Sequence, residues 1–237
     1  AARDLRVYVP AGAGPWPVLY ANDGQNLFDP AGIWGGWRLQ EALASREPLL
    51  VVGIDNTVDR FDEYTHVPDD IGYGQLTGGA GDVYAALIED HVRPHVEAVY
   101  GSTGVDGVLG SSLGGLVAMH LVLGYPQTYR GGAALSGAFW PGMDEGTALR
   151  DRLPALGKQP IAIYLDHGGN AANNSDDAAD SIEVRNMLDV MGWQLQSSPS
   201  CTAGPDALCY HSEPGATHDE LAWKARTWRF LQFLGAP

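Results

Sequence analysis

The sequence predicts an α/β fold in which a mostly parallel central sheet is covered by helices on both faces. Short apolar runs alternate with stretches of helical periodicity along nearly the whole chain, which is the pattern of repeated βαβ units. Residues 49–54 are apolar throughout, as expected for a central parallel strand that is buried on both sides. Because no repeat or linker interrupts the pattern, we expect residues 1–237 to form a single domain.

The predicted elements follow one another in the order that such a fold requires. Strands are expected at residues 5–9, 18–21, 49–54, 105–109, 132–136 and 160–166, with another beginning at Trp193. Helices are expected at residues 37–45, 83–99, 113–124, 182–191 and 219–234, with Pro94 kinking or dividing the second. The polar stretch 55–81 is long enough to carry small elements of its own. The excursion at 138–159 is short, so any lid over a site should be minimal.

Composition excludes several classes of partner. The formal net charge of −15 argues against binding to nucleic acid or to an anionic membrane surface. No apolar run reaches the roughly 18 residues of a membrane span. The Gly-rich turn near residue 110 could cradle a phosphate, but the Gly-x-x-x-x-Gly-Lys-Ser/Thr pattern is absent, and we expect no cofactor.

The two cysteines, Cys201 and Cys209, lie close together in a stretch rich in Ser, Pro and Gly. They predict a disulfide and therefore an oxidising compartment, secreted or periplasmic, with two free thiols as the alternative. No signal peptide opens the chain, whose abrupt start at Ala1 fits a processed form.

The central motif is Gly110-Ser-Ser112-Leu-Gly114, which follows an apolar run and precedes an apolar helical pattern. The order of strand, sharp turn and helix is the context of a nucleophile elbow, with Ser112 exposed at the turn. The glycines at 110 and 114 allow close approach of the backbones. One oxyanion-hole N–H is then that of Leu113, and the other comes from the loop at 23–25, where we favour Gln25 over Gly24.

A base and an acid are expected later in the chain, in the order Ser, Asp/Glu, His. His218 precedes the last helix, and Thr217-x-x-Glu220 predicts a capping box that would place it in the first helical turn. The acid candidates are Asp176 and Asp177 in the loop after the strand at 160–166, then Asp180, with Asp166 deeper at the strand end. The same acidic loop could be solvated surface or a weak calcium site, but the EF-hand spacing is missing, and we expect no metal.

Other side chains are placed near the expected site by their position after strand-linked motifs. Trp34, Trp37 and Trp140 could receive an aromatic or sugar-bearing ester, although each could equally be a buried core residue. Arg60 and Glu63 are interpreted as an ion pair that holds the long loop.

With these motifs in place, the chain resembles the putative-esterase family of α/β-hydrolases, which includes esterase D, feruloyl, acetyl-xylan and enterochelin esterases and the antigen 85 mycolyltransferases. The matching segments occur in family order over nearly the full length: 20–29, 55–56 with Arg60 and 63–64, 110–115, 135–140 and 218–223. The resemblance implies Ser112 as nucleophile, His218 as base, and Gln25 and Leu113 as oxyanion-hole donors. The substrate would be a small-molecule or polymer-linked ester, of the feruloyl or acetyl type or otherwise bulky.

The acid departs from the family pattern, which usually places Asp or Glu a few residues after the strand-end glycine. Residues 168–172 carry no carboxylate, so we expect an insertion that moves the role to Asp176 or Asp177, or else a Ser–His dyad. An acyltransferase with the same triad remains an alternative function. A non-catalytic binding module would be expected to lose Ser112 or His218, and both are present.

Overall fold

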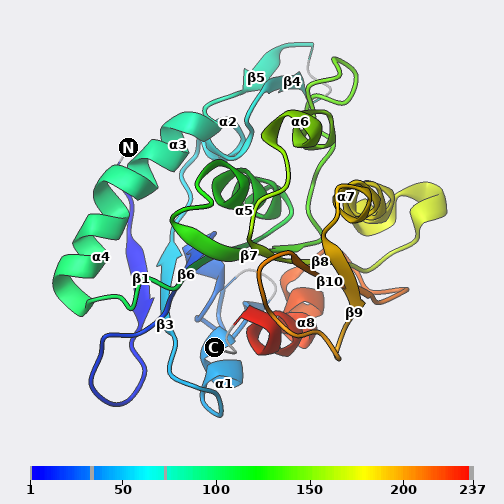
Figure 1. Cartoon of the computed structure of the whole chain (residues 1–237). Helices are drawn as coiled ribbons and strands as arrows, with labels where there is room; N and C mark the ends of the chain where they lie inside the picture. The colour runs from blue at the N-terminus through cyan, green and yellow to red at the C-terminus, as the bar shows by residue number, and fades with distance from the viewer. Residues whose placement is uncertain (1, 33–34, 72–73, 235–237) are drawn as a thin grey trace.

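The computed structural model describes residues 2–32, 35–71 and 74–234, and its centre is an eight-stranded sheet (Figure 1). The strands are β1 (Leu5–Tyr8), β2 (Val18–Asn22), β3 (Leu50–Ile54), β6 (Asp106–Ser111), β7 (Tyr129–Leu135), β8 (Ala162–His167), β9 (Gln194–Ser197) and β10 (Ala207–Ser212). Their order across the sheet is β1-β3-β2-β6-β7-β8-β10-β9. Among the described strands of this sheet, the edge pair β1–β3 is antiparallel and the other pairs are parallel, which confirms the predicted mostly parallel sheet.

Helices cover both faces of this sheet, as Figure 1 shows. On one face lie α3 (Gly81–Leu87), α4 (Arg93–Tyr100), α5 (Leu113–Gly124), α6 (Leu149–Leu156) and α7 (Ala178–Val190), and on the other α1 (Leu39–Leu43) and α8 (Glu220–Leu234). Helix α5 is buried from Leu113 to Leu123, because apart from His120 its residues are apolar or glycine on every side. Among the described residues, no helix combines the length and apolarity needed to cross a membrane.

Several elements differ from the sequence-based expectation. The helix expected at 37–45 is reduced to α1, because Arg38 adopts a left-handed conformation with φ of 51°. The stretch 55–81 contains α2 (Arg60–Tyr64) and a hairpin of β4 (Pro68–Asp70) and β5 (Leu76–Gly78). The excursion at 138–159 contains α6, and β10 was not predicted at all. Strands β4 and β5 are only three residues long, and α6 and β10 mix polar with apolar residues, so none of these elements shows a clear periodicity in the sequence.

The helix expected at 83–99 forms one continuous helical run, in which a π-helical turn at Ile88–Val92 joins α3 to α4. Pro94 is the second residue of α4. A π-helical turn widens the backbone spiral and shifts the hydrogen-bonding register, which is one way to accommodate a proline that donates no N–H. The helix that was expected to kink or divide at Pro94 is therefore continuous, with a locally widened turn at Ile88–Val92.

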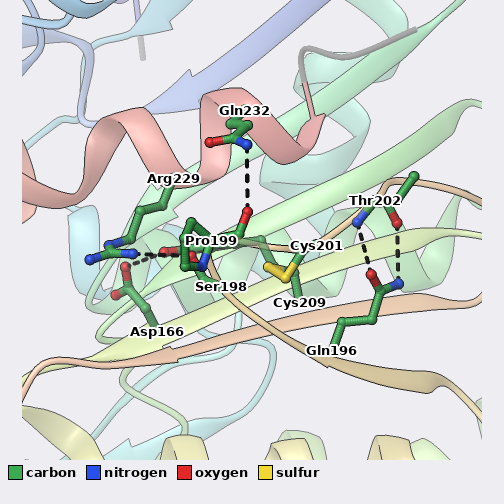
Figure 2. Close-up of a disulfide and its surroundings, with 10 residues drawn as sticks. Asp166, Gln196, Ser198, Pro199, Cys201, Thr202, Cys209, Arg229 and Gln232 are labelled. Carbon is green, nitrogen blue, oxygen red and sulfur yellow. Dashed lines mark hydrogen bonds between the residues drawn. A yellow bond between two sulfur atoms is a disulfide. The ribbon is translucent and has the colours of Figure 1, made fainter.

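The predicted disulfide is present between Cys201, in the loop before β10, and Cys209, which is buried within β10 (Figure 2). Other contacts tie the same loop to α8. Arg229 Nη1 donates to Ser198 Oγ at 3.3 Å, and Gln232 Nε2 donates to the carbonyl of Pro199 at 3.5 Å. The loop at this edge of the sheet is thus held both covalently and by the last helix.

The excursions at 55–81 and 138–159 contact each other and α5, and together they form a small cap. The β4–β5 hairpin is joined to the segment before α6, because the Gly142 N–H donates to Asp69 Oδ2 at 2.7 Å. The His66 ring stacks on the ring of His120 from α5, with centroids 5.9 Å apart, and its Nε2 lies 2.9 Å from the carbonyl oxygen of Thr147. Because a carbonyl only accepts hydrogen bonds, His66 Nε2 carries the proton there.

Burial keeps this pair of histidines neutral. Desolvation, together with the nearby Arg152 and His120, lowers the pKa of His66 to about 4 from an ordinary 6.5. The same effects of burial and Arg152 lower the pKa of His120. A group whose pKa is depressed in the folded protein is protonated first in the unfolded chain, so acid favours unfolding.

We therefore expect the free energy of unfolding to fall by about 2 kcal/mol through His66 alone between pH 7 and pH 4.5. In His66→Phe, which keeps a ring against His120, this acid-induced loss should shrink by that amount. Urea titrations of both proteins at the two pH values measure the difference. His91→Phe, at an exposed histidine on the π-helical turn, is the matched control and should follow the wild type. Equal losses in the wild type and His66→Phe would contradict the prediction.

Candidate active site

The turn between β6 and α5 has the geometry of a nucleophile elbow. Ser112 has φ of 55° and ψ of −129°, which is an unfavourable conformation for a residue with a side chain. Its backbone is held on both sides: its N–H donates to the Leu135 carbonyl at 3.0 Å, and its carbonyl accepts from Ala138 at 3.0 Å. Within the described residues, no hydrogen bond engages the Ser112 hydroxyl. The side chain is partly exposed at the carboxyl end of the sheet.

The elbow depends on two glycines because of close backbone approach. A Cβ on Gly110 would lie 2.1 Å from the carbonyl oxygen of Gly114. A Cβ on Gly114 would lie 2.9 Å from Asp23 Oδ2. The first turn of α5 therefore packs directly against the loop that follows β2.

That loop is held by an ion pair and hydrogen bonds around Asp23, which has φ of 58°. Arg60 contacts both Asp23 carboxylate oxygens at 2.7 Å, and Asn56 Nδ2 donates to Oδ1 at 2.6 Å. The Tyr64 hydroxyl accepts from the Asp23 N–H at 3.1 Å. The Asp23–Arg60 ion pair and these hydrogen bonds are partly buried. They therefore hold the turn at 24–26, which carries Gln25, in one place.

The interpretation of Arg60 and Glu63 as one ion pair is wrong. Arg60 pairs with Asp23, whereas Glu63 contacts Arg3 and accepts from the Thr57 hydroxyl at 3.1 Å. Both pairs do hold the loop after β3, but to different elements. The sequence could not reveal this, since Arg3 and Asp23 lie far from the loop along the chain.

Gln25 lies in the first turn of the short 3-10 helix at Gly24–Asn26, and Leu113 is the first residue of α5, so their backbone N–H groups lack partners within the helix. Neither makes a backbone hydrogen bond recorded for the described part of the chain. The Gln25 side chain accepts from the Asn56 N–H at 3.1 Å, which directs it back into the loop. Both N–H groups are thus free to act as donors.

The loop after β8 brings Asp176 to His218. The carboxylate Oδ1 lies 2.8 Å from His218 Nδ1, and the Asp176 side chain is 1% exposed. Its Oδ2 accepts from the Gly168 N–H and from the Ser136 hydroxyl, the latter at 2.8 Å. Because a carboxylate accepts, His218 Nδ1 donates, which leaves the Nε2 lone pair free.

The loop at 168–177 is folded tightly enough to require unusual backbone conformations. Asn174, Asp176 and Asp177 all have positive φ, at 49°, 58° and 51°. A Cβ on Gly168 would lie 2.7 Å from Asp176 Oδ2, so only glycine allows the carboxylate so close. Asn174 Nδ2 also donates to Asp180 Oδ2 at 3.0 Å, so the Asp180 carboxylate of the acidic loop bonds within the loop itself.

The remaining acid candidates occupy different environments. Asp177 Oδ2 lies 3.7 Å from His218 Nδ1, and burial raises the pKa of Asp177 to about 6. Asp166 is fully buried, accepts from the Tyr164 hydroxyl at 3.0 Å and pairs with Arg226 at 3.2 Å. Burial also raises the pKa of Asp166, to about 6. The carboxyl closest to the imidazole is therefore that of Asp176.

The predicted capping box of Thr217 and Glu220 is wrong. Helix α8 begins at Glu220, and Asp219 caps it, since its Oδ1 accepts from the Ala222 N–H at 3.0 Å. Thr217 donates to Asp219 Oδ2 at 2.5 Å, while Glu220 accepts from Asn26 at 3.1 Å. His218 thus lies just before the helix, where the Trp223 ring packs edge-on against its own at 5.1 Å.

The three tryptophans differ in their placement. Trp37 is 3% exposed and packs against Trp223 and Phe230, so its predicted contact with substrate is wrong and it is a core residue. Trp140 is partly exposed and packs on the Phe61 ring at 6.1 Å. Trp34 lies outside the described residues.

The model of the family described as "Putative esterase" matches residues 2–227. The chain belongs to this esterase family. Membership supports ester hydrolysis, and it agrees with the resemblance inferred from the motifs.

Two curated proteins are similar to this esterase in sequence. YbbA of Bacillus subtilis, described as uncharacterized, is 27% identical over 228 residues, which cover 91% of this chain and 86% of that protein. The siderophore triacetylfusarinine C esterase of Aspergillus fumigatus is 29% identical over 141 residues, which cover 54% of this chain and 46% of that enzyme.

Solved structures extend the likeness to the fold. Siderophore hydrolase EstA from Aspergillus nidulans has a TM-score of 0.69 at 19% identity, covering 98% of this esterase and 90% of that chain. The enterobactin esterase FES from Shigella flexneri has a TM-score of 0.69 at 17% identity, covering 98% of this chain and 55% of the other. At these identities the likeness establishes the α/β-hydrolase fold.

The esterase has an open hollow of about 820 Å³ on the acid side of His218. It lies between the loop at 169–176 and the loop at 212–218, and Ile182 of α7 and His167 of β8 also line it. Ser112 does not line it, so the hollow adjoins the His218–Asp176 pair and not the nucleophile itself. Across the described residues, no group of three or more His, Cys, Asp or Glu side chains is arranged to hold a metal ion.

Adding a methyl group at the elbow should be costly. In Gly110→Ala, the new Cβ would clash with the Gly114 carbonyl, and we expect the free energy of unfolding to fall by at least about 3 kcal/mol. Gly124→Ala, at the exposed end of α5 where a Cβ meets nothing within 4 Å, should be neutral or slightly stabilising. Urea unfolding of both variants tests this, and similar midpoints would contradict it.

Proposed function

We propose that this protein is a serine esterase that hydrolyses carboxylic esters through an acyl-enzyme, with Ser112 as nucleophile, His218 as general base and Asp176 as the acid. The observation that carries the proposal is the contact of 2.8 Å between His218 Nδ1 and the buried Asp176 carboxylate. Together with the strained elbow at Ser112, it supplies the parts of a catalytic triad.

Each group has a defined part in the proposed reaction. His218 Nε2 accepts the Ser112 proton while Ser112 Oγ attacks the ester carbonyl, and Asp176 stabilises the imidazolium that forms. The N–H groups of Gln25 and Leu113 donate to the oxyanion. His218 then protonates the departing alcohol, and a water molecule attacks the acyl-enzyme in the same way to release the acid.

Hydrolysis is favoured over acyl transfer by the openness of the site. The His218 side chain is 35% exposed, and the hollow beside it is open to solvent. A transferase with the same triad must exclude water from the acyl-enzyme, and within the part of the chain that the structure describes no large cap covers this histidine. A binding module is disfavoured because strain at Ser112 would serve no purpose there.

Bulky esters of the siderophore type are the proposed substrate class, with feruloyl-type or acetyl-type esters second. The triacetylfusarinine C esterase, the enterobactin esterase and the siderophore hydrolase are among the similar proteins, and a ferulic acid esterase shares the fold at a TM-score of 0.62. The hollow of about 820 Å³ offers room for part of a large substrate. Trp140, beside Phe61, is the aromatic side chain proposed to contact it.

We also propose that the enzyme works in an oxidising compartment, outside the cell or in the periplasm. The Cys201–Cys209 disulfide supports this placement, because such bonds persist where thiols are not kept reduced.

Substitutions in the triad should separate the two neighbouring carboxylates. With p-nitrophenyl acetate, Ser112→Ala should lower kcat at least about a thousandfold, and Asp176→Asn by a similar factor, because an amide cannot stabilise the imidazolium. Asp177→Asn is the matched control and should lower kcat by less than about tenfold, since its oxygen lies 3.7 Å from the ring. Full activity in Ser112→Ala, with circular dichroism confirming the fold, would refute the proposal.

Filling the hollow should affect large substrates selectively. Ala171 is exposed and lines the hollow, whereas its neighbour Ala172 is exposed and does not. In Ala171→Trp, kcat/KM for triacetylfusarinine C or enterobactin should fall about tenfold or more, while p-nitrophenyl acetate is hydrolysed as by the wild type. Ala172→Trp should leave both rates unchanged. Equal rates with the large ester in the two variants would contradict the proposal that the hollow binds part of the substrate.

A further inference from the structure

Ser136, at the carboxyl end of β7, is an unexplained residue beside the proposed triad. Its side chain is fully buried, and its φ of 45° is in the left-handed region that glycine adopts most easily. Its N–H donates to the Asp166 carbonyl at 2.9 Å. A serine held in this conformation carries a conformational cost, so its hydroxyl must contribute something that glycine would not.

The bonding of this hydroxyl fixes the direction of its proton. Trp223 Nε1 donates to Ser136 Oγ at 3.0 Å, and Arg226 Nη2 donates to it at 2.8 Å. An indole and a guanidinium only donate hydrogen bonds, so both lone pairs of the hydroxyl are occupied. The single hydroxyl proton is left for Asp176 Oδ2, which lies 2.8 Å away.

The same tryptophan also contacts the base. Trp223 and Arg226 are three residues apart on α8, so their side chains project from the same side of the helix. The Trp223 ring meets the His218 ring edge-on, with centroids 5.1 Å apart and an interplanar angle of 79°. The contacts thus close a ring that runs from His218 to Asp176, Ser136 and Trp223 and back to His218.

We propose that Ser136 and Trp223 are positioning residues, which hold the Asp176 carboxylate and the His218 imidazole in mutual alignment for proton transfer. Neither is proposed to touch the substrate, and the inference rests on the proposed serine-esterase function. Ser136 presents its proton to the Asp176 oxygen that does not face His218. Trp223 orients that hydroxyl at one end and limits the rotation of the imidazole at the other.

Charged groups surround the pair from each packed element. Asp177 lies on the same loop as Asp176, and Arg226 Nη2 lies 3.8 Å from Asp176 Oδ2. From the end of β8, Asp166 shares Arg226, and the titratable His167 interacts electrostatically with Asp176. Asp219 and Glu220 at the start of α8 interact electrostatically with His218. Because these charges stay in place when the Ser136 hydroxyl is removed, a change in pH dependence would report the lost hydrogen bond.

Ser136→Gly is the sharpest test, because it removes the hydroxyl and suits the left-handed backbone. An Asp176 carboxylate with one donor fewer should hold the protonated imidazole more tightly. We expect the acid limb of the kcat/KM profile for p-nitrophenyl acetate to move to higher pH by about half a unit or more. We expect kcat to fall about 10- to 100-fold, part of what a general base contributes, with KM within about twofold.

Trp223→Phe provides a second route, since it keeps a ring beside His218 and removes the indole donor. It should shift the acid limb in the same direction, and it carries the test if Ser136→Gly does not fold. Thr227→Val is the matched control: among the described residues, this buried hydroxyl on α8 donates to the Lys224 carbonyl at 2.9 Å and contacts no member of the proposed network. Thr227→Val should keep the pH profile and kcat of the wild type even if its melting temperature falls.

The outcomes separate the two proposals. Loss of activity in Ser112→Ala together with a shifted acid limb in Ser136→Gly or Trp223→Phe supports the positioning role. If both variants lower only the melting temperature, and the folded protein keeps the kcat and pH profile of the wild type, the positioning role is wrong and the esterase proposal stands. If Ser112→Ala retains full activity, the proposed function itself fails.

Discussion

The buried Asp176 carboxylate is the group on which the arrangement of this site depends. An ionised carboxylate withdrawn from water costs several kcal/mol unless donors surround it. Its donors come from three separate segments: Gly168 after β8, Ser136 after β7, and His218 before α8. Satisfying this one group therefore fixes two loops and a strand end relative to one another, and it compensates the strain of left-handed residues such as Asn174.

Local patterns allowed the sheet, the elbow at Ser112 and the disulfide to be predicted from the sequence, because each depends on residues close together in the chain. The acid could be narrowed only to Asp176 or Asp177, since adjacent residues share every sequence signal, and only the folded loop shows which carboxylate lies nearer to the imidazole. The partner of Arg60 was missed, and the choice between a substrate contact and a core position for Trp37 was left open, for another reason. Both depend on contacts with distant segments, about which composition and spacing carry no information.

Arg226 explains how two buried carboxylates can coexist next to one imidazole. Its side chain is fully buried and lies 3.2 Å from Asp166 and 3.8 Å from Asp176. One guanidinium thus offsets part of both negative charges, and burial still raises the pKa of Asp166 to about 6. Asp166 bonds to Tyr164 and the Ser136 N–H and does not contact His218, so it supports the network while Asp176 remains available to the base.

On the proposed mechanism, attack on the ester creates positive charge on His218 and negative charge on the former carbonyl oxygen. The positive charge forms 2.8 Å from Asp176 and 3.7 Å from Asp177. The negative charge forms near Leu113, where α5 begins and its dipole is positive. The net charge of −15 would disfavour an oxyanion if the electrostatic field of the whole protein acted on it. Exposed charges, however, are screened by salt beyond roughly 8 Å. Local N–H dipoles therefore decide the stability of the transition state, and the acidic surface need not slow the reaction.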